Sequence, residues 1–202
     1  TKKEEIMKTP FGFIVLDKPC GLTSHDCVNK MRKIFGIRRI GHSGTLDPTV
    51  TGVLPIAIGN ATRLLQYLPG EKKYIGTIQI GTRTNTDDMQ GEILSIQNWP
   101  LMDNCYLENL ISHFRGEFQQ RPPNFSSINI KGERAYKKAR RGDQFQINTR
   151  QININELKIL SWIQEEGKLE IEITCSAGTY IRSLARDIGE EIGCGASLLK
   201  LR

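Results

Sequence analysis

The sequence predicts an α+β domain in which helices flank a mixed, largely antiparallel sheet. Three observations support this fold class. Several short runs alternate in hydrophobicity as strands do, other runs repeat their apolar residues at helical spacing, and the two kinds do not alternate as regular βαβ units. The chain has 202 residues, of which 38% are hydrophobic and 25% charged, which suits a globular domain with its own core. We therefore expect a single domain over residues 1–202.

The first third of the chain is expected to hold two strands and two helices. Residues 12–17, GFIVLD, have the apolar character of a short buried strand. A helix follows to Phe35, with Ser24 as its N-cap and Gly36 as its C-terminal stop. The apolar run VLPIAIG predicts a second strand, after which Asn60 is expected to cap a short helix.

The middle of the chain continues with two strands and a helix. Residues 73–81 alternate as a strand that has Tyr74 on its apolar face. A polar loop, GTRTNTDDMQGE, leads to a further strand, EILSI. Asp103 is expected to begin a helix with one apolar stripe, and Gly116 is expected to close it.

The last part of the chain is predicted to complete the sheet. Residues 119–150 show little periodicity apart from a basic helix, so we expect an irregular insertion there. Strands are predicted at 151–160 and 168–175, where apolar and polar residues alternate. An amphipathic helix is expected from about Thr179 onwards.

The charge of the chain favours a polyanionic partner. Its net charge is +6 and its pI is near 9.1. Residues 131–141, KGERAYKKARR, hold six basic side chains and one acid. Such a stretch is either a solvated helix face or a nucleic-acid patch, and Tyr136 within it offers a stacking surface that favours the second.

Several classes of protein are disfavoured by what the sequence contains. Its five cysteines are scattered without a CxxC pair, which indicates free thiols in a reducing compartment. The three histidines do not fall at zinc spacings, so we expect no metal. No apolar run reaches transmembrane length, and the N-terminal TKKEEIMKTPF lacks the apolar core of a secretory signal. We therefore expect a cytoplasmic protein without a membrane partner.

Residues 41–55, GHSGTLDPTVTGVLP, form a glycine-rich loop that contains a single acid, Asp47. The loop lacks the Lys-Ser/Thr pair of a phosphate-binding P-loop. It could be a plain surface turn, since Asp-Pro and Gly are ordinary turn residues. A catalytic interpretation rests on Pro48, which holds Asp47 extended and restricts its carboxylate. Gly44 and Gly52 would let a substrate approach closely.

A carboxylate so placed could act as a nucleophile or as a base, and it would need a partner to stay ionised and oriented. The segment CSAGTYIRSLARD offers Arg182, which is expected in the first turn of the last helix. An arginine beside Asp47 would lower its pKa and could hold it through two hydrogen bonds. The alternative is that Arg182 is an ordinary surface arginine.

Five segments, in order and at natural spacing, carry more information together than any one of them alone. They are IVLDKPCGLTSHD, GHSGTLDPTVTGVLPIAIGNATRLLQYL, KKYIGTIQIGTRTNTDDMQGE, RPPNFSSINIKGERAYKKARRG and CSAGTYIRSLARDIGEEIGCGASLLKLR. With these segments the chain closely resembles the TruB family of bacterial tRNA pseudouridine synthases, from about Phe13 to Arg202. The resemblance implies a pseudouridine-synthase-like fold in which residues 119–150 are an RNA-binding insertion.

The resemblance also implies an activity, namely isomerisation of the T-loop uridine at position 55 of tRNA to pseudouridine. The C1′–N1 glycosidic bond breaks, the base turns, and C5 bonds to C1′. The family uses no cofactor and no metal. The expected partner is the TΨC arm of tRNA, and the protein is expected to act as a monomer.

The family's motifs place the essential aspartate at Asp47. By the same resemblance Tyr74 would stack on the target base, which must be turned out of the RNA to reach a pocket. Arg182 would pair with Asp47, while Tyr180 and Leu201 would line the pocket. Judged by residue type alone, Tyr74, Tyr180 and Leu201 could equally be residues that pack in the core.

Other residues are implied to bind the RNA. His42 would insert into the T-loop and displace bases by stacking. Lys18 and Arg63 match positive positions near the active site and serve either phosphates or the structure. The insertion would follow phosphates with basic residues at i, i+4 and i+7 of its helix, which hold and orient the RNA without specifying sequence. These residues are Arg134, Lys138 and Arg141.

Two questions stay open at the level of sequence. Asp47 either attacks C1′ directly or takes the C2′ proton, since both routes need an ionised carboxylate near the ribose. The function is either enzymatic or that of a non-catalytic tRNA-binding or tRNA-folding helper, and a glycosidase is disfavoured because such enzymes use a pair of acids.

Family members usually continue into a small β-rich RNA-binding domain that the 202 residues do not include, so we expect weaker tRNA binding with the chemistry retained.

Overall fold

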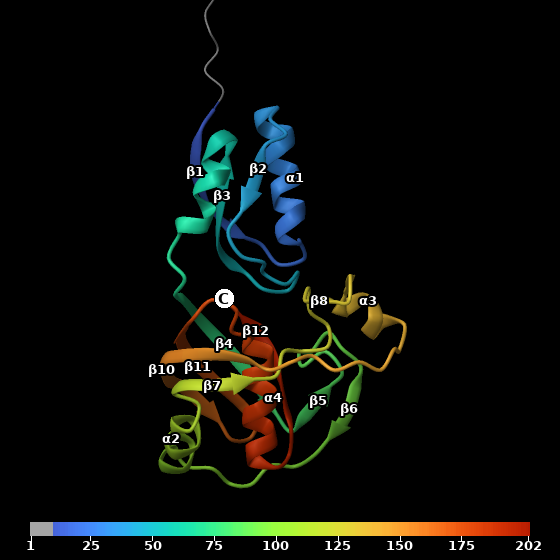
Figure 1. The fold of residues 1–202 in the computed structure, drawn as a ribbon. Coiled ribbons are helices and arrows are strands. Elements are labelled where there is room, and N and C mark those ends of the chain that lie inside the picture. The colour runs from blue at the N-terminus through green and yellow to red at the C-terminus, as the bar shows by residue number, and fades with distance from the viewer. Residues whose placement is uncertain (1–9) are drawn as a thin grey trace, which may run out of the picture. The chain divides into compact units, whose positions relative to one another are not determined.

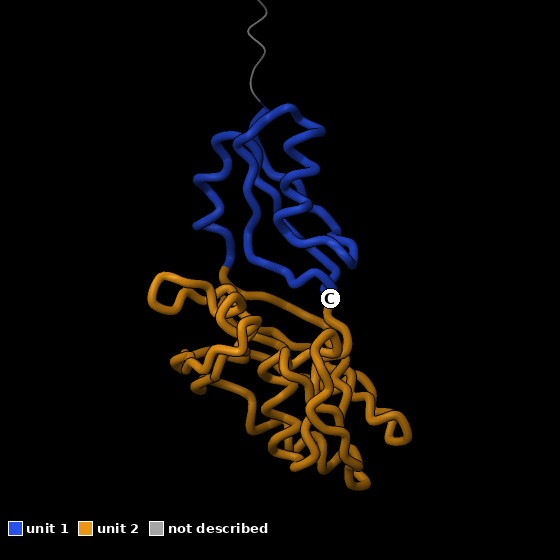
Figure 2. Tube along the Cα trace, turned by 90° about the vertical axis from the view of Figure 1, so that its right-hand side faces the viewer, with its two compact units in different colours: residues 1–69, 202 blue, residues 70–201 orange. Residues whose placement is uncertain are grey.

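A computed structural model describes residues 10–202 of the chain. The expectation that the N-terminal segment is not a secretory signal concerns mainly residues 1–9, which lie outside the described residues. The chain forms two compact units (Figure 2). Unit 1 comprises the residues up to Pro69 together with Arg202, and unit 2 comprises Gly70–Leu201.

Unit 1 is a three-stranded antiparallel sheet with a helix packed on it (Figure 1). The strands are β1 (Gly12–Lys18), β2 (Ile40–His42) and β3 (Gly52–Ile58), in the order β1-β3-β2. Helix α1 (Ser24–Phe35) and the 3-10 helix η1 (Gly59–Tyr67) complete the unit. The inward residues of α1 and the sheet form one apolar core, made by Cys27, Val28, Ile40, Leu54, Ile56 and Ile58.

The ends of α1 are set by local chemistry, although the expected N-cap was wrong by one residue. Thr23 is the N-cap, because its hydroxyl accepts from the backbone N–H of Asp26 while the Asp26 carboxylate accepts from the N–H of Thr23. Ser24 is thereby released to bind elsewhere. At the other end Gly36 adopts φ 64°, the left-handed conformation that favours glycine, as expected for the C-terminal stop.

Two further expectations for unit 1 need correction. Asn60 does not cap η1, whose N-cap is Ile58 without a side-chain hydrogen bond. The Asn60 side chain instead accepts a hydrogen bond from Arg39. The short strand β2, which overlaps the start of the glycine-rich loop, was not predicted because three residues give too little alternation to detect.

Unit 2 is built on a five-stranded antiparallel sheet in the order β12-β4-β11-β10-β7. These strands are β4 (Lys72–Ile80), β7 (Gly116–Gln120), β10 (Arg150–Ile163), β11 (Lys168–Cys175) and β12 (Ala196–Leu201). Helices α2 (Asn104–Ser112) and α4 (Ile181–Ile192) share one apolar core with the inward residues of β4, β10 and β11. Both helices therefore cover the same face of this sheet (Figure 1).

The predicted fold class is confirmed, because every pairing between these strands is antiparallel and helices pack on the sheet. Two small antiparallel pairs extend unit 2. One joins β5 (Thr82–Thr84) to β6 (Ile93–Ile96), and the other joins β8 (Asn129–Ile130) to β9 (Glu133–Arg134), which leads into the short helix α3 (Ala135–Arg140).

Three boundaries of unit 2 differ from the expectations. Helix α2 ends at Ser112 with His113 as its C-cap, so Gly116 begins β7 instead of closing the helix. Strand β5 lies within the segment expected to be a loop. Strand β12 was not predicted because its first three residues, Ala196–Leu198, are all buried, which removes the alternation typical of a strand.

Some broad properties can be stated for residues 10–202. None of their helices is both long and apolar enough to span a membrane. No group of three or more His, Cys, Asp or Glu side chains within this part of the chain is placed to hold a metal ion. All five cysteines are free thiols, of which Cys20 and Cys105 are exposed.

Candidate functional site

Asp47 lies in a loop of unit 1 that is fastened on both sides of the carboxylate. On one side the backbone N–H of Leu46 donates to Ser24 Oγ at 2.9 Å, and that hydroxyl lies 3.3 Å from the Leu46 carbonyl. On the other side the Pro48 carbonyl accepts from the N–H of Gly21 at 2.8 Å. The backbone of Asp47 is already restricted because a proline follows it, and these hydrogen bonds restrict it further. The half-buried Asp47 side chain therefore extends from a backbone held in one position.

Lys18 also holds the Asp47 loop in place. It is fully buried, and its Nζ donates to the carbonyl oxygens of Pro19, Leu22 and Pro48 at 2.9, 2.6 and 3.2 Å. An ammonium group has three protons, and all three are engaged here. Of the two roles that the sequence left open for Lys18, these contacts support the structural one over phosphate binding.

His42 ends β2 on the N-terminal side of the same loop. Its Nδ1 lies 2.6 Å from the carbonyl oxygen of Gly44, which requires Nδ1 to carry the proton because a carbonyl only accepts. The next residue is held as well, since the N–H of Ser43 donates to the Pro55 carbonyl at 3.0 Å. The imidazole is thus oriented by the loop's own backbone.

Four of the candidate residues in unit 2 gather at one end of its sheet. Because the strands are antiparallel, the start of β4 lies beside the end of β11, and the end of β12 lies beside Gly76 in the middle of β4. Tyr74 is near the start of β4, and Leu201 is at the end of β12, where its Cδ1 would lie 3.3 Å from a Cβ built on Gly76. Tyr180 is the N-cap of α4, Arg182 lies in its first turn, and this helix follows the end of β11.

Arg182 is a buried residue, with 7% of its surface exposed, and not the surface arginine of the alternative interpretation. Its Nη1 donates to the Thr86 carbonyl at 3.0 Å and its Nη2 to the Phe125 carbonyl at 3.1 Å. Its Nη1 also lies 3.7 Å from Asp88 Oδ2. The guanidinium is therefore placed by the loop after β5 and by the insertion. Its pairing with Asp47 stays a prediction.

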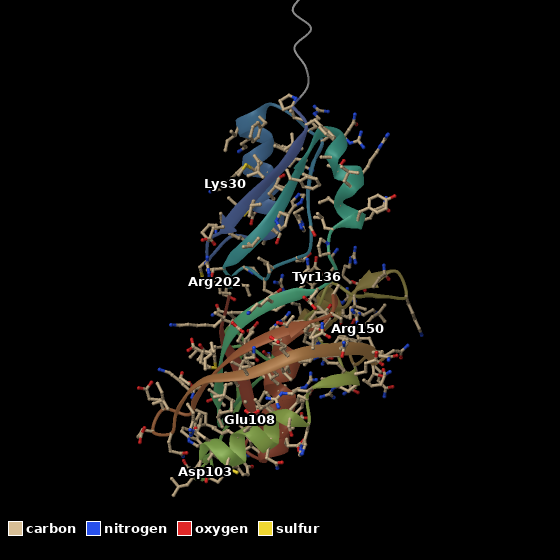
Figure 3. The ribbon with its side chains drawn as sticks, turned by 90° about the vertical axis from the view of Figure 1, so that its left-hand side faces the viewer. Lys30, Asp103, Glu108, Tyr136, Arg150 and Arg202 are labelled. Atoms are coloured by element: carbon tan, nitrogen blue, oxygen red, sulfur yellow. The ribbon has the colours of Figure 1, made fainter. Side chains whose placement is uncertain are left out.

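Tyr180 is fixed by a glutamine and covered by an arginine. The Tyr180 backbone N–H donates to Gln120 Oε1 at 2.9 Å, and Gln120 Nε2 donates to the Tyr180 carbonyl at 3.1 Å. Gln120 is fully buried, so the pair is shielded from water. The guanidinium of Arg150, at the start of β10 (Figure 3), lies 5.4 Å from the centre of the Tyr180 ring, which is cation–π distance.

The basic insertion differs from the expected helix. Helix α3 covers only Ala135–Arg140, so of the three expected phosphate contacts Lys138 alone lies within it, while Arg134 is the N-cap and Arg141 the C-cap. Arg134 donates to the Ser127 carbonyl at 2.6 Å. Lys138 lies 3.7 Å from Glu133.

Arg141 has the strongest local partners of the three. It hydrogen-bonds both Glu133 and Asp143, and these bonds raise the pKa of its guanidinium. The bond from Arg141 in turn lowers the pKa of the Glu133 carboxyl. Glu133 and Asp143 therefore match part of the positive charge in this stretch.

The last of the predicted site residues, Arg63, is exposed on η1 in unit 1.

The sequence analysis did not predict a role for Asp88, because it assigned the segment TNTDD to a polar loop. A signal was present, since Arg182 and Arg186 lie four residues apart on an amphipathic helix, and buried arginines need acids or carbonyls as partners.

The site residues thus form two groups, each built by one unit. Unit 1 supplies Asp47 on a fastened loop and His42 at the start of that loop. Unit 2 supplies an aromatic side chain, a buried arginine and apolar neighbours at one end of a sheet. An oriented carboxylate, an aromatic face and a guanidinium are the groups that chemistry on a nucleotide base and its ribose would use.

Comparisons with known proteins agree on one family. A family model described as TruB family pseudouridylate synthase (N terminal domain) matches residues 32–181. A relative from Prochlorococcus marinus (strain NATL2A), named tRNA pseudouridine synthase B, is 62% identical over 97% of this chain and 62% of its own length. One of the same name from Synechococcus sp. (strain WH7803) is 57% identical over 97% of this chain and 65% of its own length. The chain thus spans about three fifths of the length of these relatives.

Solved structures show the same fold. A crystal structure of a Cbf5-Nop10-Gar1 complex matches with a TM-score of 0.71 and 31% identity, over 95% of this chain and 47% of that one. A structure of an H/ACA RNP bound to a substrate RNA containing 2′-deoxyuridine matches with a TM-score of 0.68 and 30% identity, over 95% and 46% of the two chains. The chain belongs to the TruB family of pseudouridylate synthases.

Proposed function

We propose that this chain is the catalytic part of a tRNA pseudouridine synthase that converts the T-loop uridine at position 55 of tRNA to pseudouridine. Membership of the TruB family supports the reaction, and relatives named tRNA pseudouridine synthase B support the substrate. The structural observation that carries the proposal is the fastening of the Asp47 loop on both sides by Ser24 and Lys18. A carboxylate that must reach one face of a ribose benefits from such an oriented attachment.

The proposed reaction balances without a co-reactant. The C1′–N1 bond breaks, the uracil turns, a C1′–C5 bond forms, and one proton leaves C5 while N1 gains one. The target nucleotide must first leave its stack, because C5 and C1′ cannot be worked on within it. Asp47 would act on the ribose, and Tyr74 would stack on the base with its hydroxyl near the C5 proton.

The other residues are assigned supporting roles in this proposal. Arg182 would keep the Asp47 carboxylate ionised and oriented. Tyr180 and Leu201 would border the base, and His42 would stack in the T-loop. The insertion would hold phosphates through its exposed cations. We further propose that the protein acts as a monomer in the cytoplasm, with the two units serving one catalytic domain.

The proposal is tested by tritium release from tRNA that carries 5-tritiated uridine. The parent chain should release tritium, and Asp47→Asn should not, while both bind tRNA equally. The matched control is Glu165→Gln, the same loss of charge at an exposed turn residue of unit 2, which should keep the parent's rate. Binding without release by the parent chain would contradict the proposal and favour a non-catalytic RNA helper.

A second experiment separates the two roles open to Asp47. If Asp47 takes the C2′ proton, tRNA with deuterium at C2′ of the target uridine should react several-fold more slowly. If Asp47 attacks C1′, the C2′–H bond stays intact and the rate should barely change. The parent chain serves for both, since the comparison is between substrates.

A further inference from the structure

The positive charge of the chain gathers in a second place besides the basic insertion. Within unit 1, counted from residue 10, eight Lys and Arg face three Asp and no Glu. Unit 2 has seventeen basic and seventeen acidic residues, so it is neutral as a whole. The basic insertion is offset by acids elsewhere in its unit, whereas the surplus of the described chain belongs to unit 1.

This surplus is concentrated in residues 30–39, KMRKIFGIRR, which contain five cations and no acid. They form the second half of α1 and the segment that leads into β2. We call their cations the α1 basic surface, and Figure 3 marks Lys30 on it. Lys30, Lys33, Arg38 and Arg39 are exposed, and Arg32 is half-buried.

Two arginines of the α1 basic surface are held by neutral oxygens. Arg39 donates from Nε to Thr62 Oγ1 at 3.0 Å and from Nη1 to Asn60 Oδ1 at 2.7 Å. Arg32 donates to Asn29 Oδ1 at 3.0 Å and to the Ile40 carbonyl at 3.2 Å. A guanidinium fixed by neutral acceptors is oriented but keeps its full charge, unlike Arg141 of unit 2, which is paired with two carboxylates.

The helix dipole explains only part of this cluster. Cations in the last turn of a helix are favourable, which accounts for Arg32 and Lys33. Arg38 and Arg39 lie beyond the C-cap Gly36, where the helix has already ended. Holding oriented, uncompensated cations together costs free energy through their mutual repulsion, which an anionic partner would relieve.

The α1 basic surface lies at the opposite end of α1 from the Asp47 loop. Ser24, the first residue of α1, holds Leu46, whereas Arg32 in the last turn bonds Ile40. A helix rises about 1.5 Å per residue, so the two ends of this 12-residue helix are roughly 18 Å apart. An anion bound at the basic end is therefore not the nucleotide that meets Asp47.

We infer that the α1 basic surface binds backbone phosphates of the tRNA at a distance from the modified nucleotide. The inference rests on the proposed function for the identity of the RNA. Oriented arginines suit discrete phosphates, and such contacts position the RNA without reading its sequence. Phe35, exposed among these cations, adds a ring that can lie against a sugar or base.

The test is the salt dependence of tRNA binding. In Lys33→Gln/Arg38→Gln both changed side chains are exposed, so the fold should be kept. Each lost phosphate contact removes about 0.7–0.9 from the slope of log K against log salt, so the double variant should lower it by about 1.5. At saturating tRNA the rate of tritium release should match the parent, since the contact is remote from Asp47.

The matched control is Lys158→Gln/Lys168→Gln, which removes the same charge from an exposed and a half-buried lysine of unit 2 that are both paired with acids. Its slope should equal the parent's. An unchanged slope in the α1 variant, or an equal fall in both variants, would overturn the inference. So would loss of binding to phosphatidylserine vesicles by the α1 variant with tRNA binding intact.

The inference and the proposed function can fail separately. If the parent releases tritium but the α1 variant binds tRNA as the parent does, only the inference is wrong. If the parent binds tRNA through the α1 basic surface but releases no tritium, the surface stands as an RNA contact and the proposed reaction is wrong.

Discussion

Arg186 in α4 donates from Nη1 to Oδ2 of Asp87 at 2.9 Å, and the pair is nearly buried. The same guanidinium donates from Nη2 to the Arg121 carbonyl and to Asp187. Asp87 has φ 61°, so its backbone is left-handed, and burial raises the pKa of its carboxyl while Arg186 opposes the rise. One buried arginine therefore ties together α4, the loop after β5 and the start of the insertion.

Removing Arg186 should destabilise the protein strongly. Arg186→Met leaves the Asp87 and Asp187 carboxylates with less compensation in a buried place, which typically costs about 3–5 kcal/mol. Asp87→Asn should cost less, because asparagine tolerates a positive φ and Arg186 keeps Asp187 and a carbonyl. Urea unfolding followed by circular dichroism measures both.

The double variant Arg186→Met/Asp87→Asn provides the control. If the two side chains interact as the 2.9 Å distance indicates, the double variant should lose less stability than the sum of the single losses. Additive losses would show that the pair contributes nothing as a pair.

The elements that could be predicted from sequence are those with a strong local pattern. Helix α1 has a hydroxyl before its first turn and a glycine after its last, and β11 alternates strictly between buried and half-buried residues. The N-cap was misplaced because Thr23 and Ser24 are adjacent and both can cap. Only the long-range bond from Ser24 to Leu46 decides between them. Strand β12 shows no alternation over its first three residues, because all three are buried.

The resemblance predicted which residues form the site, but it did not predict the contacts that hold those residues in place. Lys18 in DKPCG cannot be recognised as a buried anchor from its neighbours, because its partner Pro48 is 30 residues away. The acceptors of Arg182, the carbonyls of Thr86 and Phe125, are 96 and 57 residues away and belong to the backbone, which leaves no trace in side-chain identity. Such supports come from tertiary structure.

Thr23→Ala should destabilise α1. The Thr23 hydroxyl accepts from the Asp26 N–H at 2.9 Å and donates to the Asp26 carboxylate. Loss of an N-cap threonine costs about 1 kcal/mol. Ser24→Ala, at the next position, should leave the cap intact but free the Asp47 loop, so it should lower the rate of tritium release more than Thr23→Ala does.

The Asp26 carboxyl should titrate below its usual pKa of 3.8, because the Thr23 hydroxyl and backbone N–H both donate to it. A lowered pKa in the folded state means that this contribution to stability is complete above the unfolded pKa and is lost as the pH falls through the folded pKa. A carboxyl titration by NMR should give a midpoint below 3.8 in the parent and a higher one in Thr23→Ala. Equal midpoints in the two proteins would contradict the capping box.

Two of the five thiols should react rapidly with a disulfide reagent at pH 8. Cys20 and Cys105 are exposed, whereas Cys27, Cys175 and Cys194 are buried. Burial raises the pKa of Cys175 to about 11, so little thiolate is present even when reagent reaches it. Absorbance should show two fast thiols and three that react only on unfolding, and Cys20→Ser/Cys105→Ser should abolish the fast phase. A third fast thiol would mean that one of the buried sites opens readily.

Gly189→Ala should destabilise the protein even though alanine is the better helix former. Gly189 lies in α4 where the chain turns back into β12, and an added Cβ would lie 2.1 Å from the Ala196 nitrogen and 2.3 Å from the Gly195 carbonyl carbon. Both are backbone atoms that cannot rotate away. The clash should outweigh the roughly 1 kcal/mol that alanine gains in a helix, for a net loss of about 1–3 kcal/mol.

Ser183→Ala on the same helix is the matched comparison. The Ser183 hydroxyl is buried and has no hydrogen-bond partner among residues 10–202. Its removal therefore abolishes the free-energy cost of burying an unpaired polar group, and it adds no atom that could clash. We expect this variant to be as stable as the parent or slightly more stable in urea unfolding. If Gly189→Ala were equally harmless, β12 would have to move away from α4, and the strand pairing of Ala196 with Ile80 should then lose protection against amide hydrogen exchange.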